Sequence, residues 1–162
     1  MPMKDKVISF LNEAGIPFRI TEHPAVYTMA DMQALELQRL GTIPKNLFIK
    51  DGKGKRHFIV TACMDTQIDL KALSEKLDAK KLGLASAERL EKYLGVSAGC
   101  VSPLGVINDR ENAVTVIFDS KLQGLDRLGV HPNVHDATLW LSFGDLKRAV
   151  ELAGNEAQIL DL

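Results

Sequence analysis

Lys45 is the residue of this sequence best placed to hold a charge in a fixed position. It follows Pro44 and comes just before the apolar segment 47–49, which is typical of a buried strand. A lysine ammonium can bind a phosphate as a point charge, or donate a hydrogen bond to an oxyanion that develops during a reaction. Most lysines serve only solubility, but a lysine anchored by a buried strand can be held in place. Lys45 is therefore a candidate catalytic or anion-binding residue.

The segment 98–109 is a second candidate, because it combines two glycines and a proline with apolar side chains. Gly99 and Gly105 permit backbone angles that other residues avoid, and Pro103 fixes its own φ. Such a loop has a defined shape, and its carbonyls and amides can approach a ligand closely. A buried connector with ordinary turn glycines has the same composition, so the loop on its own leaves both interpretations open.

Other reactive arrangements find little support. The sequence has no GxSxG, P-loop or GxGxxG pattern, which argues against a serine hydrolase and the common nucleotide-binding folds. Cys100 is interpreted as a small inert apolar residue and not as a nucleophile. His131 and His135 have the spacing of a helical metal pair, but Pro132 and Asn133 between them disfavour a helix. We therefore expect neither a metal nor a cofactor.

Composition and charge limit the class of protein. The 162 residues, 46% hydrophobic and 25% charged, predict one globular domain over residues 1–162. No apolar run is long enough to span a bilayer, and two distant cysteines without metal-ligand spacing suggest a reducing, cytoplasmic setting. The net charge of −1 argues against a protein that coats nucleic acid non-specifically. We expect a monomer without membrane contact.

A local basic cluster stands out against this balanced charge. Beyond Lys45, it consists of Lys50, Lys53, Lys55 and Arg56, with Asp51 as the acidic residue among them. The cluster fits a solvated turn, and it equally fits a hairpin that makes a few contacts with nucleic-acid phosphates.

The pattern of apolar residues, glycines and prolines predicts the elements that position these residues. Helices are expected at 4–14, 29–40, 70–77, 87–94 and 143–153, with N-caps at Thr28, Asp69, Ser86 and Ser142. Strands are expected at 18–23, 47–50, 57–62, 81–85, 114–119 and in the apolar segment 137–143, with 120–136 irregular. The helix at 29–40 should bury Met32, Leu35 and Leu40. The tight turn at 51–54 makes its two strands antiparallel, so a mixed sheet is expected.

Four short motifs, in this order along the chain, resemble those of the YbaK-like aminoacyl-tRNA editing family. They lie at 45–48, 99–103, 106–109 and 131–133. The family comprises freestanding relatives of the editing domain inserted in bacterial prolyl-tRNA synthetase, and the resemblance covers nearly the whole chain. It implies an α+β fold with a mixed, barrel-like β-sheet flanked by helices.

The resemblance also implies an activity, the hydrolysis of a mischarged aminoacyl-tRNA ester with water as the nucleophile. The motifs are most similar to those of the freestanding enzymes that remove alanine from tRNA(Pro), and the cysteine-removing branch is the nearer alternative. The implied partners are the acceptor end of tRNA(Pro) and, for docking, prolyl-tRNA synthetase. A nucleic-acid-binding module and an amino-acid sensor, both without catalysis, stay open as alternatives of another class.

Residue roles follow from the same resemblance. It implies that Lys45 and Gly99 are catalytic, and that substrate contacts come from Tyr27, Thr28, Asn46, Ser102, Pro103, Leu104, Gly105 and His131. Lys45 would hold the 3′ end of the tRNA or the developing negative charge. Nucleic-acid contacts are assigned by charge alone to Lys50, Lys53, Lys55 and Arg56.

Overall fold

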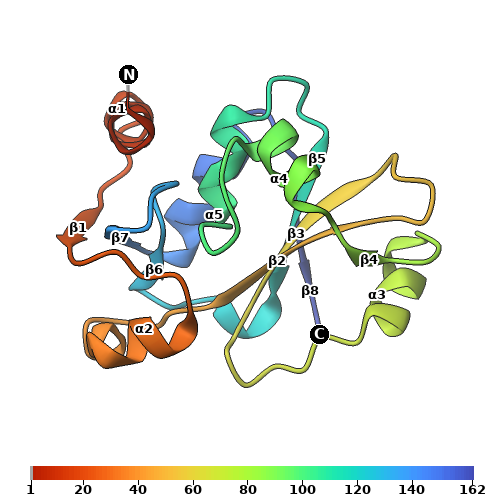
Figure 1. Ribbon diagram of the computed structural model, residues 1–162, viewed down its shortest axis with the longest axis horizontal. Coiled ribbons are helices and arrows are strands. Elements are labelled where there is room, and N and C mark those ends of the chain that lie inside the picture. Colours follow the sequence, from red (N-terminus) through yellow and green to blue (C-terminus); the bar gives the residue numbers. More distant parts are fainter. Residues whose placement is uncertain (1) are drawn as a thin grey trace.

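The computed structural model describes residues 2–162, which form helices packed on two β-sheets (Figure 1). The helices are α1 (Met3–Glu13), α2 (Met29–Ala34), α3 (Leu70–Leu77), α4 (Ala87–Leu94) and α5 (Phe143–Leu152), with short 3-10 helices η1 (Leu37–Arg39), η2 (Pro103–Asn108) and η3 (Ser120–Leu122). The strands are β1 (Arg19–Glu22), β2 (Lys45–Lys50), β3 (His57–Ala62), β4 (Gly83–Leu84), β5 (Val114–Asp119), β6 (Leu128–Val130), β7 (Ala137–Leu141) and β8 (Ala157–Leu160). Within the described range, no helix is both long and apolar enough to cross a bilayer.

The larger sheet is mixed, and its strand order is β4-β2-β3-β5-β8. β2 pairs with β3 and β4 in antiparallel fashion, whereas β3 with β5 and β5 with β8 are parallel. The smaller sheet, β1-β7-β6, is antiparallel, and a bridge between Thr42 and Leu128 links the two sheets. The predicted α+β fold with a mixed sheet is confirmed, and residues 2–162 form no closed barrel.

The predicted N-caps are confirmed and explain where the helices begin. At α2, Thr28 and Asp31 form a capping box, in which each side chain accepts a hydrogen bond from the other residue's backbone N–H. Asp69, Ser86 and Ser142 likewise accept hydrogen bonds from backbone N–H groups in the first turns of α3, α4 and α5.

The helix predicted at 29–40 is wrong beyond residue 34. Glu36 adopts a left-handed backbone conformation, with φ of 56°, and only a short 3-10 helix follows. This turn brings Leu37 into a small core with Trp140 of β7. Leu40, which the pattern predicted to be buried, is instead 44% exposed.

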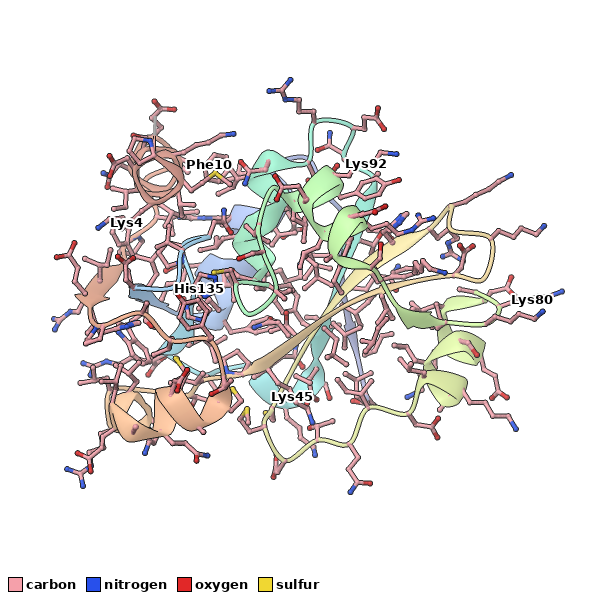
Figure 2. All side chains as sticks on the ribbon, in the orientation of Figure 1. Lys4, Phe10, Lys45, Lys80, Lys92 and His135 are labelled. Carbon is pink, nitrogen blue, oxygen red and sulfur yellow. The ribbon has the colours of Figure 1, made fainter. Side chains whose placement is uncertain are left out.

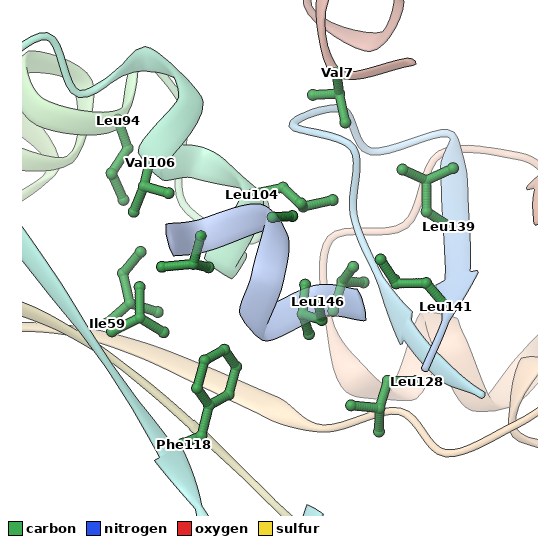
Figure 3. Packing of buried hydrophobic residues seen from close by; sticks show 14 of the residues in the cluster. Val7, Ile59, Leu94, Leu104, Val106, Phe118, Leu128, Leu139, Leu141 and Leu146 are labelled. Carbon is green, nitrogen blue, oxygen red and sulfur yellow. The ribbon is translucent and has the colours of Figure 1, made fainter. Parts of the chain in front are cut away.

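The main core fixes the two segments on which the site depends, the start of β2 and the loop before η2. Ile59 of β3 and Phe118 of β5 belong to one buried cluster with Leu104 of η2 and Leu146 of α5 (Figure 3). The cluster continues into the smaller sheet, while α3 contributes Leu73 to a second cluster with other residues of β2, β3 and β5. The central strands are therefore buried on both faces and form a rigid base.

Candidate active site

A cavity of about 300 Å³ opens where the start of β2, the segment before α2, the glycine loop and the smaller sheet meet. Apolar side chains form most of its wall, and a few polar groups face it. The wall consists of Val26, Tyr27, Thr28, Met29, Met32, Ile43, Pro44, Lys45, Asn46, Leu47, Gly99, Val101, Gly129, Val130, His131 and Thr138. A small, mostly apolar cavity with few polar groups is typical of a small-molecule site.

Lys45 is the cationic side chain of this wall (Figure 2). It is the first residue of β2 and lies opposite Ala62 of β3, so pairing between these strands fixes its backbone. Its ammonium donates a hydrogen bond to the carbonyl of Thr66. None of the ion pairs formed within residues 2–162 includes Lys45. Its positive charge is therefore held by a neutral group, and further N–H donors remain for a ligand.

Asn46 provides an oriented amide next to this charge. Its side-chain oxygen accepts a hydrogen bond of 2.6 Å from the hydroxyl of Thr61, the residue opposite it on β3. This bond occupies the oxygen and leaves the amide N–H groups of Asn46 to donate to a ligand.

Gly99 lies where the glycine loop packs tightly against the segment before α2. Its φ is +89°, and a Cβ at this position would lie 3.0 Å from the carbonyl oxygen of Tyr27 and 3.3 Å from Cε1 of His135. Only glycine combines this backbone angle with so close a contact. The loop can therefore pack directly on the segment before α2 and close the cavity on that side.

His135 ties these two segments together. Its Nδ1 donates to the carbonyl of Val26 at 2.9 Å, and its Nε2 lies 2.9 Å from the hydroxyl of Ser97. Its ring packs against that of Tyr27, with centroids 4.4 Å apart and planes tilted by 37°. In the sequence, His135 stands out only by its spacing from His131. Its role depends on contacts with Val26, Tyr27 and Ser97, which are distant in the sequence, so no local pattern predicts it.

His131 supplies a neutral imidazole to the cavity. Burial lowers the pKa of this side chain, and a hydrogen bond between Nδ1 and the carbonyl of Ala137 only partly opposes that effect. With Nδ1 donating at 3.2 Å, Nε2 is a hydrogen-bond acceptor. Within residues 2–162, no group of three or more side chains of the kinds that bind metals gathers in one place.

Comparisons with known proteins show the family to which this chain belongs. Residues 23–149 match the family model of the aminoacyl-tRNA editing domain. The chain belongs to the aminoacyl-tRNA editing domain family.

Individual relatives of the editing family match over nearly the whole chain. The "Prolyl-tRNA editing protein ProX" of Acetoanaerobium sticklandii is 42% identical over 162 residues, which are 100% of this chain and 99% of that protein. "Prolyl-tRNA synthetase associated domain-containing protein 1" of Danio rerio is 34% identical over 151 residues, 92% of this chain and 82% of that protein. A solved structure of a candidate trans-editing enzyme for prolyl tRNA synthetase has a TM-score of 0.78 at 20% identity, with 100% and 97% of the two chains covered. That structure supports the fold alone.

Most of the residues that resemblance to the editing family suggested for the site come together at the cavity. Those at its wall are Tyr27, Thr28, Lys45, Asn46, Gly99 and His131. The residues that continue the loop lie elsewhere. They are buried in and before η2 and do not form part of this wall; they are Ser102, Pro103, Leu104 and Gly105. The Ser102 hydroxyl accepts a hydrogen bond from the backbone N–H of Leu104 at 3.0 Å, so Ser102 is the N-cap of η2.

The basic cluster lies at the opposite end of β2 from Lys45. The strand has six residues, which separate its ends by about 16 Å at the usual rise. Lys53 and Lys55 are exposed at the turn, which projects from the sheet in Figure 1. The guanidinium of Arg56 instead donates to the carbonyls of Leu77 and Asp78 at the end of α3. Any nucleic-acid contact of this hairpin would be made away from the cavity.

Cys100 is next to Gly99 but is unsuited to nucleophilic attack. Its side chain is buried, and burial raises the pKa of its thiol to about 12. The thiolate, which is the reactive form, is therefore scarce at neutral pH.

Proposed function

We propose that this chain is a trans-editing deacylase that hydrolyses the ester of alanine mischarged on tRNA(Pro). In this proposal water is the nucleophile, Lys45 assists, and no metal takes part. The observation that carries it is the lysine ammonium held by a neutral carbonyl at the wall of a small cavity. The relative named a prolyl-tRNA editing protein, matched over its full length, supports the choice of substrate.

The chemistry of an aminoacyl ester suits these groups. The ester is already reactive, so a hydrolase needs to position water and stabilise charge more than it needs a nucleophilic side chain. A free N–H of the Lys45 ammonium can donate to the developing oxyanion or hold the 3′ end of the tRNA. The loop backbone around Gly99 can orient the attacking water, and the terminal ribose hydroxyl can assist proton transfer.

The size of the cavity fits a small amino acid. Its volume of about 300 Å³ has to hold the amino acid, the ester and part of the terminal ribose. A synthetase site built for proline rejects alanine poorly, because each missing methylene changes the binding free energy by only about 1–3 kcal/mol. A second site that admits only small side chains can supply the remaining selectivity.

Such an enzyme would work in the cytoplasm as a monomer, with prolyl-tRNA synthetase as a docking partner.

A deacylation assay tests the proposal. Alanyl-, cysteinyl- and prolyl-tRNA(Pro) are incubated with the protein, and the amino acid that remains esterified is followed over time. We expect alanyl-tRNA(Pro) to be hydrolysed about tenfold or more faster than the other two, because cysteine adds a sulfur atom and proline two methylenes to alanine, and even a single methylene can change the rate by that factor in a fitted pocket. Faster release of cysteine would assign the protein to the cysteine-removing branch. Faster release of proline would contradict an editing role.

Absence of release from all three would favour a non-catalytic role. An RNA-binding module that uses the basic hairpin would then bind tRNA with an affinity that falls steeply with salt. A sensor would bind free alanine or cysteine with little effect of salt.

Replacing Cys100 with serine should leave most of the deacylation rate intact. The thiol is buried and protonated at neutral pH, so it is not the attacking group. Initial rates of the variant and of the unmodified protein, with and without iodoacetamide, provide the measurement. Loss of turnover in a variant that melts at the normal temperature would instead identify Cys100 as a nucleophile.

A further inference from the structure

Asp119, the last residue of β5, is a fully buried carboxylate, which is rare unless hydrogen bonds compensate the charge. Its Oδ2 accepts from the Thr66 hydroxyl at 2.6 Å and from the Cys63 N–H at 3.1 Å, and its Oδ1 accepts from the Lys121 N–H at 3.1 Å. Burial acts to raise the pKa of this carboxyl, but these hydrogen bonds outweigh it and hold the pKa below its ordinary value. Asp119 is therefore ionised at neutral pH.

The segment that Asp119 holds carries the acceptor of the Lys45 ammonium. The backbone N–H of Thr66 donates to the carbonyl of Cys63 at 3.1 Å, so residues 63–66 form a closed turn. Thr66 is itself buried, and its carbonyl accepts the hydrogen bond from Lys45. One residue thus connects the two charges, with its hydroxyl on the carboxylate and its carbonyl on the ammonium.

This arrangement directs the ammonium without neutralising it. A carboxylate bonded directly to Lys45 would compensate the positive charge that a substrate anion needs. A carbonyl instead occupies one of the three ammonium donors and leaves the charge available. Asp119 belongs to a central strand buried on both faces, so it gives the turn a rigid reference point.

We propose that Asp119 is a positioning residue for Lys45 and acts on it through Thr66. The inference rests on the proposed function, because it takes Lys45 as the group that the substrate requires. Asp119 itself does not form part of the cavity wall.

Two variants remove this connection in different ways. In Asp119→Asn, the amide N–H₂ replaces one carboxylate oxygen and faces the backbone N–H of either Cys63 or Lys121, so the negative charge and one acceptor are lost while the side-chain shape is kept. In Thr66→Val, the hydroxyl is lost and the backbone carbonyl stays. We expect each variant to lower the deacylation rate about tenfold, because a small displacement of a catalytic group slows a reaction strongly. The loss should fall on the same parameter, kcat or KM, that Lys45→Ala changes.

Matched controls separate positioning from general destabilisation. Asp109 is also a buried carboxylate, and it accepts hydrogen bonds from Val114 and Asn155 at the other end of β5. Asn155→Ala removes the hydrogen bonds of Asn155 to Asp109 and to the Val114 carbonyl from outside the candidate loop, so it should lower the melting temperature and leave the rate per folded molecule unchanged. Thr66→Ser keeps the hydroxyl and should restore the rate to nearly that of the unmodified protein.

A double-variant comparison, under single-turnover conditions, tests whether Asp119 acts through Lys45. Added to Lys45→Ala, the Asp119→Asn change should cost no further activity, because the group it positions is gone. An equal tenfold loss in that background would overturn the inference, as would unimpaired rates of folded Asp119→Asn and Thr66→Val proteins. If Asp119→Asn does not fold, the rate of the Thr66→Val protein decides whether the inference holds.

A failure of the proposed function gives a different result. The unmodified protein would then release no amino acid, or Lys45→Ala would be fully active.

A crystal structure of Asp119→Asn or, failing that, of Thr66→Val tests the positioning role independently of activity. We expect the Lys45 ammonium to leave the Thr66 carbonyl. An ammonium that stays on this carbonyl would rule out the connection.

Discussion

Replacing Lys45 with alanine should lower kcat/KM for deacylation of alanyl-tRNA(Pro) by about a hundredfold to a thousandfold, the usual effect of removing an oxyanion donor. The side chain supplies the cation of the cavity wall, and no ion pair within residues 2–162 compensates its charge. The rates of amino-acid release under steady-state and single-turnover conditions provide the measurement. A loss confined to kcat would indicate contact with the developing charge, and a rise in KM alone would indicate contact with the 3′ end.

The fold should tolerate this substitution, because Lys45 contributes one hydrogen bond from its side chain and its strand pairing is made by the backbone. Lys71→Ala, which removes an exposed lysine of α3, is the matched control and should keep both the activity and the melting temperature. Lys45→Arg keeps the charge but replaces a compact ammonium by a planar, larger group, so we expect little recovery. Full activity of a folded Lys45→Ala protein would remove the lysine from the mechanism.

The parts of the site that sequence alone could predict are those with a local signature. Lys45 could be identified because Pro44 and the apolar residues after it place it at the start of a strand. The importance of Gly99 could be inferred because a glycine close to a proline marks a loop with special backbone angles, and the structure gives it a φ of +89°. The caps at Thr28 and Asp69 also act within one helical turn, and both are present.

The parts that sequence could not predict depend on contacts between distant segments. Resemblance to the editing family places Ser102–Gly105 among the substrate contacts, whereas the structure packs the apolar side chain of Leu104 in the main core and leaves this segment out of the cavity wall. The pattern predicts an irregular segment at 120–136, but the structure forms the short strand β6 within it. This strand needs Gly129, since a Cβ there would lie 2.5 Å from the Trp140 ring across the strand pair. The connection between Asp119 and Thr66 spans 53 residues and has no local signature.

Gly99→Ala should reduce deacylation by about a hundredfold, the effect expected when a reacting group is misplaced by about 1 Å. The new methyl group would lie 3.0 Å from the carbonyl oxygen of Tyr27 and 3.3 Å from the ring of His135. The first contact is with backbone, which cannot move aside by rotating a side chain. The loop or the segment before α2 therefore has to shift, and both form the cavity wall.

Gly99→Ala should also lower the free energy of unfolding independently of the cavity, because alanine disfavours a positive φ. Gly124→Ala isolates that effect, since Gly124 has a φ of +80° but a methyl group added there would meet no atom within 4 Å. Both variants should lose about 1–2 kcal/mol of unfolding free energy from the backbone alone, measured by urea denaturation. Only Gly99→Ala should also lose activity, because only there does the methyl group push on the wall that positions the ester. Equal activities of the two folded variants would mean that the close approach of the loop to Tyr27 does not matter for catalysis, and the attacking water would then have to be oriented by groups other than this loop.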